Sequence, residues 1–118
     1  MQISIQSRGF TLTDALNDYV HKRISFTLTR TASRIRRIDV KLSDINGTRG
    51  GIDKRCLIEI RLDGRTNVIV QDIQADMYIA IDRAISRSAR TVMRRLALET
   101  DRRRTDEALQ MHQRSAEM

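Results

Sequence analysis

One short segment places several arginines where they could bind phosphate together. Residues 76–96 carry arginines at positions 83, 87, 90, 94 and 95 and no lysine. An α-helix turns about 100° per residue, so Arg83, Arg87, Arg90 and Arg94 would project within a sector of roughly 60°. A guanidinium group binds phosphate through two parallel hydrogen bonds and stacks on bases. The spacing therefore predicts a phosphate-binding helix face, and the choice of arginine over lysine favours RNA.

A solvated charged face is the alternative interpretation, because most surface helices carry one. Such faces usually mix acids with bases four residues apart. Here Asp82 is the only acid between Asp76 and Leu96. Four like charges one helical turn apart also repel each other, and a bound polyanion would relieve this repulsion. The single sign of the charges favours a binding surface.

Residues for catalysis or metal binding are scattered along the chain. His21 falls in the first predicted helix and His112 near the end, and no Cys, His and acid cluster has metal-ligand spacing. Asp72, Asp76 and Asp82 fall at a strand end, a helix cap and a helix, which gives little support to a carboxylate pair. Neither a G-x-S-x-G motif nor a P-loop occurs. We therefore expect no enzyme activity, no metal, no cofactor and no small-molecule substrate.

Two sequence features bear on how RNA would be read. Two Tyr and two Phe are too few for the stacking platform that an RRM or an OB fold uses on single strands. The GTRG segment at 47–50 formally matches the clamp of KH domains, but that clamp joins two helices and this segment lies between two predicted strands. We interpret it as a mobile hairpin loop. Recognition should therefore depend on backbone shape and charge.

The overall charge agrees with a polyanion partner. The 118 residues carry a net charge of +7, with a sequence pI near 10.7, and such a balance favours polyanions through counterion release. Residues 1–96 hold 18 Lys and Arg against 10 Asp and Glu, a net +8, whereas residues 97–118 hold 4 against 5, a net −1. The basic character thus belongs to the first 96 residues.

The compartment is expected to be the reducing cytoplasm. No run approaches the roughly 18 apolar residues of a membrane span, and the start lacks the charged and apolar regions of a signal peptide. Cys56 is the only cysteine and lies in the apolar run CLIEIRL. It excludes an internal disulfide and is expected to be a buried structural thiol. No membrane partner is expected.

Hydrophobic periodicity predicts an α+β fold in the order β-α-β-β-β-α. Alternating apolar residues mark strands near 3–5, 37–43, 56–62 and 68–73, with a turn at Asp63-Gly64 between the last two. Thr13 and Asp76 are placed to cap helices, the first running to about Arg30. The elements predict a four-stranded, mostly antiparallel sheet with both helices on one face, because each helix has a single apolar stripe to bury.

The second helix should serve both the core and the partner. Its apolar residues lie opposite the arginines and can dock on the sheet; they are Met77, Ile81, Ala84, Ile85, Ser88, Val92 and Leu96. Residues 1–96 would form the binding domain. Residues 97–118 lack a persistent apolar stripe, so we expect a helix extension that frays into a flexible tail.

Two blocks of the sequence resemble a known family. The block DMYIAID at 76–82 precedes the basic helix, and LTDAL at 12–16 opens the first helix after an I-x-I strand. Over about residues 1–96 the chain resembles the ribosome hibernation promoting factor and ribosome-associated translation inhibitor family. The resemblance implies a factor that binds the small ribosomal subunit in the mRNA and tRNA channel and inhibits translation under stress or in stationary phase.

The resemblance also implies which residues contact ribosomal RNA. Arg87, Arg90 and Arg94 match basic positions of the relatives' second helix, and Arg23 matches one in the first helix. Phe26 stands where relatives usually carry lysine. With their basic neighbours, the expected contacts to ribosomal RNA are Lys22, Arg23, Arg83, Arg87, Arg90, Arg94 and Arg95.

The chain shows no counterpart of the dimer-forming second domain of long family members. We therefore expect either the short form, which favours paired ribosomes, or the inhibitor form, whose tail can occupy the mRNA path.

Two other interpretations remain open at the level of sequence. The order α-β-β-β-α is embedded in the predicted fold and is that of a stand-alone double-stranded RNA-binding module. Such a module would prefer bare duplexes over assembled ribosomal subunits. A small enzyme or metabolite-binding domain is the other alternative, and it would bind a ligand or metal at stoichiometry.

Overall fold

The computed structural model confirms the predicted order of elements. It describes the backbone of residues 1–45, 52–64 and 67–117, with side chains 101 and 111–117 left out, so the GTRG segment lies outside the described residues. A short 3-10 helix, η1, is the one element that the sequence pattern did not predict. The elements are β1 (Gln2–Arg8), α1 (Asp14–Thr27), η1 (Thr29–Arg34), β2 (Ile35–Asp44), β3 (Lys54–Leu62), β4 (Val68–Gln74) and α2 (Met77–Glu117).

The four strands form one mixed sheet in the order β1-β2-β3-β4. The β2–β3 and β3–β4 pairs are antiparallel, as predicted for most of the sheet, whereas β1 runs parallel to β2. The chain between these two strands contains α1, and parallel neighbours require such a crossover. The crossover through the first helix therefore permits the parallel pair that makes the sheet mixed.

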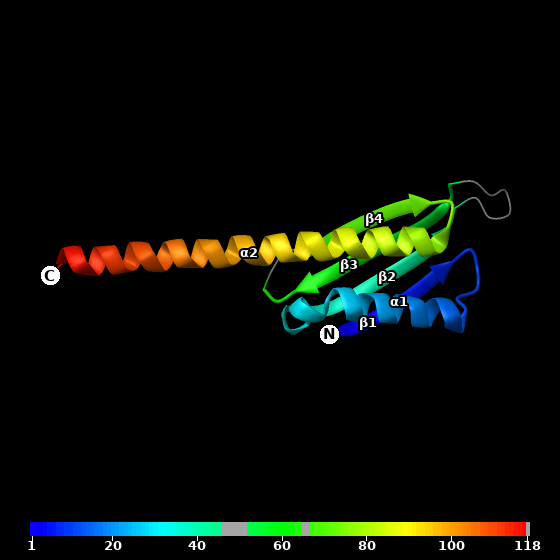
Figure 1. The fold of residues 1–118 in the computed structure, drawn as a ribbon, viewed down its shortest axis with the longest axis horizontal. Coiled ribbons are helices and arrows are strands. Elements are labelled where there is room, and N and C mark those ends of the chain that lie inside the picture. The colour runs from blue at the N-terminus through cyan, green and yellow to red at the C-terminus, as the bar shows by residue number, and fades with distance from the viewer. Residues whose placement is uncertain (46–51, 65–66, 118) are drawn as a thin grey trace.

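Both helices cover the same face of the sheet, as predicted (Figure 1). In β4, Val68 and Val70 are buried while Ile69 between them is exposed, which is the alternation expected of a strand with one covered face. The apolar stripe of α2 meets this face through Ile81 and Ile85, both fully buried. The α1 residues that join the same core are Leu16, Val20 and Ile24.

Both helices begin at the residues that the sequence identified. The Thr13 hydroxyl accepts a hydrogen bond from the Leu16 N–H at 3.2 Å. The Asp76 carboxylate accepts one from the Tyr78 N–H at 2.8 Å. These side chains satisfy N–H groups that have no partner within the helix. The predicted end of the first helix was too late, because α1 stops at Thr27 and the chain tightens into η1.

Helix α2 continues far beyond the core (Figure 1), giving the molecule extents of 73 × 23 × 18 Å. It spans 41 residues, so the helical extension that we expected beyond Leu96 runs to Glu117. The segment contains neither Gly nor Pro, and Glu99 pairs with Arg103 one turn later at 3.1 Å. Its division from the domain at residue 96 and its flexibility stay predictions.

Candidate nucleic-acid interface

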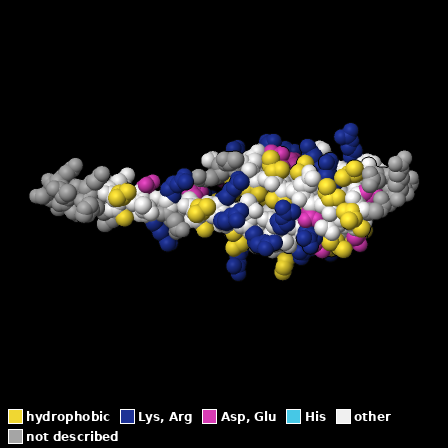
Figure 2. Space-filling view, turned by 90° about the horizontal axis from the view of Figure 1, so that it is seen from above, with side chains coloured by type: hydrophobic (Ala, Val, Ile, Leu, Met, Phe, Trp, Pro, Cys, Tyr) yellow, Lys and Arg dark blue, Asp and Glu magenta, His cyan; other side chains and the backbone are white. Residues whose placement is uncertain are grey.

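Four arginines of α2 form the exposed face that the sequence predicted, and we call them the arginine stripe: Arg83, Arg87, Arg90 and Arg94. The side chains of Arg83 and Arg87 are 61% and 49% exposed. Ile81 and Ile85 on the other side of the helix are buried. Figure 2 shows Lys and Arg side chains gathered along the middle of the molecule. One helix thus contributes to the core and presents cations to solvent.

A buried carboxylate lies beneath the first half of the stripe. Asp72 of β4 is only 7% exposed, and its Oδ2 lies 3.5 Å from Arg83 Nε and 3.2 Å from Arg87 Nη1. Arg87 Nη1 also donates to the Gln71 carbonyl at 3.0 Å. Gln74 donates to the other Asp72 oxygen at 2.7 Å. Asp72 therefore anchors two arginines of the stripe to the sheet.

Asp72 is the residue of the candidate site that sequence reasoning missed. It was assigned only a place at a strand end, with little support for a role. A signal was present, because Val68, Val70 and Asp72 occupy alternate positions of β4, and the first two are core residues. A carboxylate at an inward-facing position needs a partner. The arginines one helix away supply it.

The second half of the stripe carries unpaired charge. Among the described residues, neither Arg90 nor Arg94 has an acidic partner, and both are exposed. With Arg87 and Thr91 they line an open hollow of about 360 Å³. Three guanidinium groups therefore surround one space that no protein carboxylate fills, a suitable arrangement for phosphate.

Arg95 lies apart from the stripe. Its Nη1 donates to the Asn67 carbonyl at 2.9 Å, and its side chain is half-buried against the β3–β4 connection. This contact holds α2 to the sheet. Arg95 was also among the expected RNA contacts, and that assignment stays a prediction.

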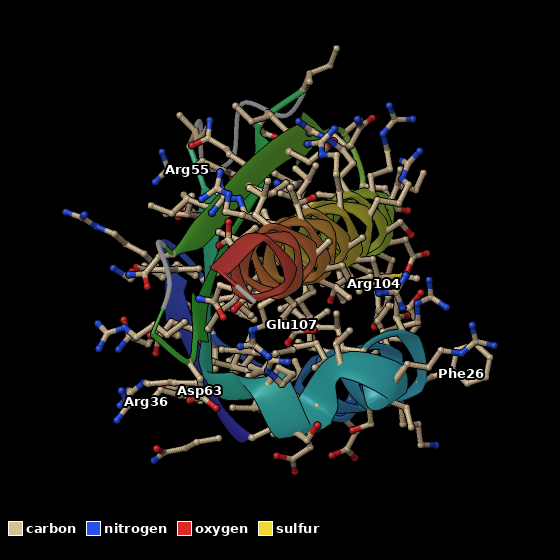
Figure 3. All side chains as sticks on the ribbon, turned by 90° about the vertical axis from the view of Figure 1, so that its left-hand side faces the viewer. Phe26, Arg36, Arg55, Asp63, Arg104 and Glu107 are labelled. Carbon is tan, nitrogen blue, oxygen red and sulfur yellow. The ribbon has the colours of Figure 1, made fainter. Side chains whose placement is uncertain are left out.

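The cations of α1 contribute a smaller surface. Lys22 is exposed, but Arg23 Nε lies 3.1 Å from Asp82 Oδ1 of α2, with one-third of its side chain exposed. Phe26 is 81% exposed and points away from the body of the protein (Figure 3). The first helix therefore offers fewer free charges than α2.

The same Asp82 oxygen joins the two helices through a second contact. It accepts a hydrogen bond from the Tyr19 hydroxyl at 2.5 Å, and this bond, together with burial, raises the pKa of Tyr19 above its usual value. The Tyr19 ring meets Tyr78 edge-on, with centroids 4.8 Å apart. Tyr19, Arg23 and Asp82 thus fix α1 against the start of α2.

Cys56, the cysteine in the core, has a structural role. Cys56 is fully buried, and burial, with a smaller effect from the charge of Asp72, raises the pKa of its thiol to about 12. Within the described parts of the chain, no group of three or more His, Cys, Asp or Glu residues is arranged to hold a metal ion. The described helices include none that is both long and apolar enough to cross a bilayer.

Comparison with known proteins identifies the family. The family model described as sigma-54 modulation protein / S30EA ribosomal protein matches residues 3–97. The crystal structure of the Thermus thermophilus Protein Y N-terminal domain is 31% identical, with a TM-score of 0.65 over 80% of this chain and 98% of that chain.

A ribosomal subunit interface protein from Coxiella burnetii is 20% identical, with a TM-score of 0.69 over 82% of this chain and 99% of that one, which supports the fold alone. No curated protein sequence gives a significant match. The family match includes the whole arginine stripe and ends one residue after Leu96. The chain belongs to the sigma-54 modulation protein / S30EA ribosomal protein family.

Proposed function

We propose that this protein is a cytoplasmic ribosome-associated factor that binds the small subunit through the arginine stripe. There it blocks the mRNA and tRNA channel and inhibits translation under stress or in stationary phase. The observation that carries the proposal is the hollow lined by Arg87, Arg90 and Arg94, where the three exposed guanidinium groups meet no acid of the described residues other than Asp72 beneath Arg87. Membership of a family that includes a ribosomal protein supports ribosomal RNA as the polyanion.

The stripe has an anchored part and a free part, and each has a role in binding. Asp72 holds Arg83 and Arg87 in place before RNA arrives, so less side-chain entropy is lost on binding. Arg90 and Arg94 carry the uncompensated charge that attracts the phosphates. Asp72 also offsets part of the repulsion between neighbouring arginines. Together these contacts favour a rigid cationic ridge over a loose cluster.

Helix α2 should supply most of the binding energy, and α1 should mainly hold α2 in position. Arg23 is engaged by Asp82, and Phe26 supplies no charge at its exposed position. Lys22 alone of the expected α1 contacts has neither an ion pair nor a hydrogen bond among the described residues. We therefore assign the contacts from α1 a supporting role.

A stand-alone double-stranded RNA-binding module is the second candidate. The observation that favours it is the succession of α1, β2, β3, β4 and α2, which is the order of that module. A competition experiment separates the two functions. A ribosome-binding factor should be retained on small subunits in the presence of excess bare RNA duplex, whereas a duplex-binding module should be displaced.

Co-sedimentation with purified small subunits at increasing salt tests the proposal. The variant Arg87→Gln/Arg90→Gln/Arg94→Gln removes three charges from the stripe. If each arginine neutralises one phosphate, the slope of log K against log salt should become shallower by about 2.1, taking ~0.7 per phosphate for single-stranded RNA. Binding at moderate salt should be lost.

A matched variant controls for net charge. Arg36→Gln/Arg37→Gln/Arg61→Gln removes three arginines that pair with acids on the other side of the sheet. It should bind subunits nearly as well as wild type. Equal loss in both triple variants, or full binding by the stripe variant, would contradict the proposal.

A further inference from the structure

The face of the sheet that the helices leave open carries a second group of cations, which we call the sheet cluster: Arg8 of β1, Lys41 of β2 and Arg55 of β3. The register pairs Arg8 with Ser43 and Ser43 with Arg55, so both arginines flank the same position of β2. Lys41 lies two residues before Ser43 and points to the same side. Figure 3 shows Arg55 on the side of the sheet away from the helices.

The sheet cluster differs in charge balance from the other end of the same face. There, each arginine has an acidic neighbour: Arg37 with Asp39 at 2.9 Å, Arg61 with Glu59 at 3.9 Å, and Arg36 with Asp63 at 3.6 Å. Figure 3 shows Arg36 and Asp63 close together at that end. Within the described residues, Arg8, Lys41 and Arg55 have no acidic partner at all.

The geometry of Arg55 leaves hydrogen-bonding capacity unused. Its Nη2 donates to the Ser43 hydroxyl at 3.4 Å, while its Nε is buried and has no hydrogen-bond partner. Buried polar groups in folded proteins are nearly always hydrogen-bonded. One long hydrogen bond to Ser43 thus leaves the other terminal donors of the guanidinium group without a partner among the described residues. A bound anion would accept hydrogen bonds from these terminal donors.

The three cations line a concave surface. A hollow of about 290 Å³ lies between the strands, and Gln6 and Ser43 contribute polar groups beside the cations. The backbones of Arg8 and Arg55 flank β2 roughly 10 Å apart, a distance that long side chains can close around one anion. None of the described residues that line the hollow is aromatic. It is therefore suited to a phosphate group and offers nothing on which a base could stack.

We propose that Arg8, Lys41 and Arg55 form a second phosphate-binding site, which takes the backbone of an RNA segment other than the one on the arginine stripe. Two guanidinium forks and an ammonium group without acids match closely spaced phosphates. The sheet separates this site from the stripe, so one protein can lie between two RNA segments. The inference goes beyond the proposed function and holds even if the stripe has another partner.

The test uses protein in which the stripe is silenced by Arg87→Gln/Arg90→Gln/Arg94→Gln. This protein is titrated with a short single-stranded RNA and followed by NMR of its backbone amides and arginine Nε–H groups. The largest shifts should fall on Arg8, Lys41, Ser43 and Arg55. Adding Arg8→Gln/Lys41→Gln/Arg55→Gln should make the residual salt slope shallower by about 2.1.

Two controls make the outcome decisive. Adding Arg36→Gln/Arg37→Gln/Arg61→Gln instead removes the same charge from the same face and leaves three acids without their arginine partners, yet it should weaken RNA binding less. Since Arg55 is half-buried, the double variant Arg8→Gln/Lys41→Gln, whose two sites are exposed, tests the site without disturbing folding. This double variant should show about two-thirds of the change in salt slope that is expected for Arg8→Gln/Lys41→Gln/Arg55→Gln.

Three results would overturn the proposal. The shifts could gather at Arg36, Arg37 and Arg61, or the two triple variants could lose binding equally. Pyrophosphate alone could also bind as tightly as the RNA, which would make the hollow a site for free anions. The assay contains no ribosomes and no functional stripe, so its failure is distinct from failure of small-subunit binding.

Discussion

Replacing Asp72 with Asn separates the charge of this residue from its shape and tests how the stripe is built. The substitution removes the negative charge 3.5 Å from Arg83 Nε and 3.2 Å from Arg87 Nη1. Both arginines are about half exposed, so each ion pair should contribute at the surface level of about 0.2–1 kcal/mol. We expect Asp72→Asn to lower the free energy of unfolding by about 1 kcal/mol, measured by urea denaturation.

The effect on binding is the more informative quantity. In the Asp72→Asn variant, the side chains of Arg83 and Arg87 are free before binding. RNA binding must then order both of them, at a cost of about 0.5–1.5 kcal/mol each. Against this, removing the carboxylate relieves its repulsion of the bound phosphate, which solvent and the intervening guanidinium groups largely screen. The net expectation is binding weaker by about 1 kcal/mol, or about fivefold.

Fluorescence-detected titration of small subunits at fixed salt gives this ratio directly. Asp39→Asn is the matched control, since it removes a carboxylate paired with Arg37 on the opposite face of the sheet. It should change subunit binding little. If Asp72→Asn bound more tightly than wild type, Asp72 would only oppose the RNA, and the argument that it positions the stripe would be wrong.

Four further predictions concern three individual side chains. Ile85→Ala should lower the free energy of unfolding by about 2–5 kcal/mol in denaturant titrations, because Ile85 is fully buried in the core; a loss below about 1 kcal/mol would contradict this. Phe26→Lys should leave the melting temperature nearly unchanged and tighten subunit binding, since Phe26 is 81% exposed; unfolding of the variant would disprove the first part. The Cys56 thiol, with its pKa raised to about 12 by burial, should resist iodoacetamide in the native protein, as read by mass spectrometry. Stability should also fall as pH rises from about 9 towards 12, because the unfolded thiol ionises first.

Local patterns in the sequence were sufficient for most of the fold. Alternating apolar residues marked the strands, and Thr13 and Asp76 marked the helix starts, because these signals depend on neighbours within a few residues. The arginine sector also followed from helix geometry alone. The parallel pairing of β1 with β2 made the sheet mixed, a feature for which no local pattern exists.

The parts of the site that escaped prediction depend on contacts between distant residues. Asp72 meets Arg87 only because β4 lies under α2, and Arg23 meets Asp82 only because the two helices cross the same sheet face. Arg95 was expected only as a contact to RNA beside the stripe, and its contact with the Asn67 carbonyl depends on the β3–β4 connection. Charge counts along the sequence identify a basic helix but cannot distinguish free arginines from anchored ones.

A site-specific crosslink tests the central claim most directly. Cys56 is buried, so a cysteine introduced by Thr91→Cys, inside the hollow of Arg87, Arg90 and Arg94, can be labelled selectively with a photoactivatable reagent. Ser33→Cys, at an exposed position on η1, serves as the control. On ribosomes, the label at position 91 should crosslink to small-subunit RNA lining the mRNA channel, and the label at position 33 should do so much less. Crosslinks from position 91 only to ribosomal proteins or to large-subunit RNA would contradict the assignment of the arginine stripe as the small-subunit binding face.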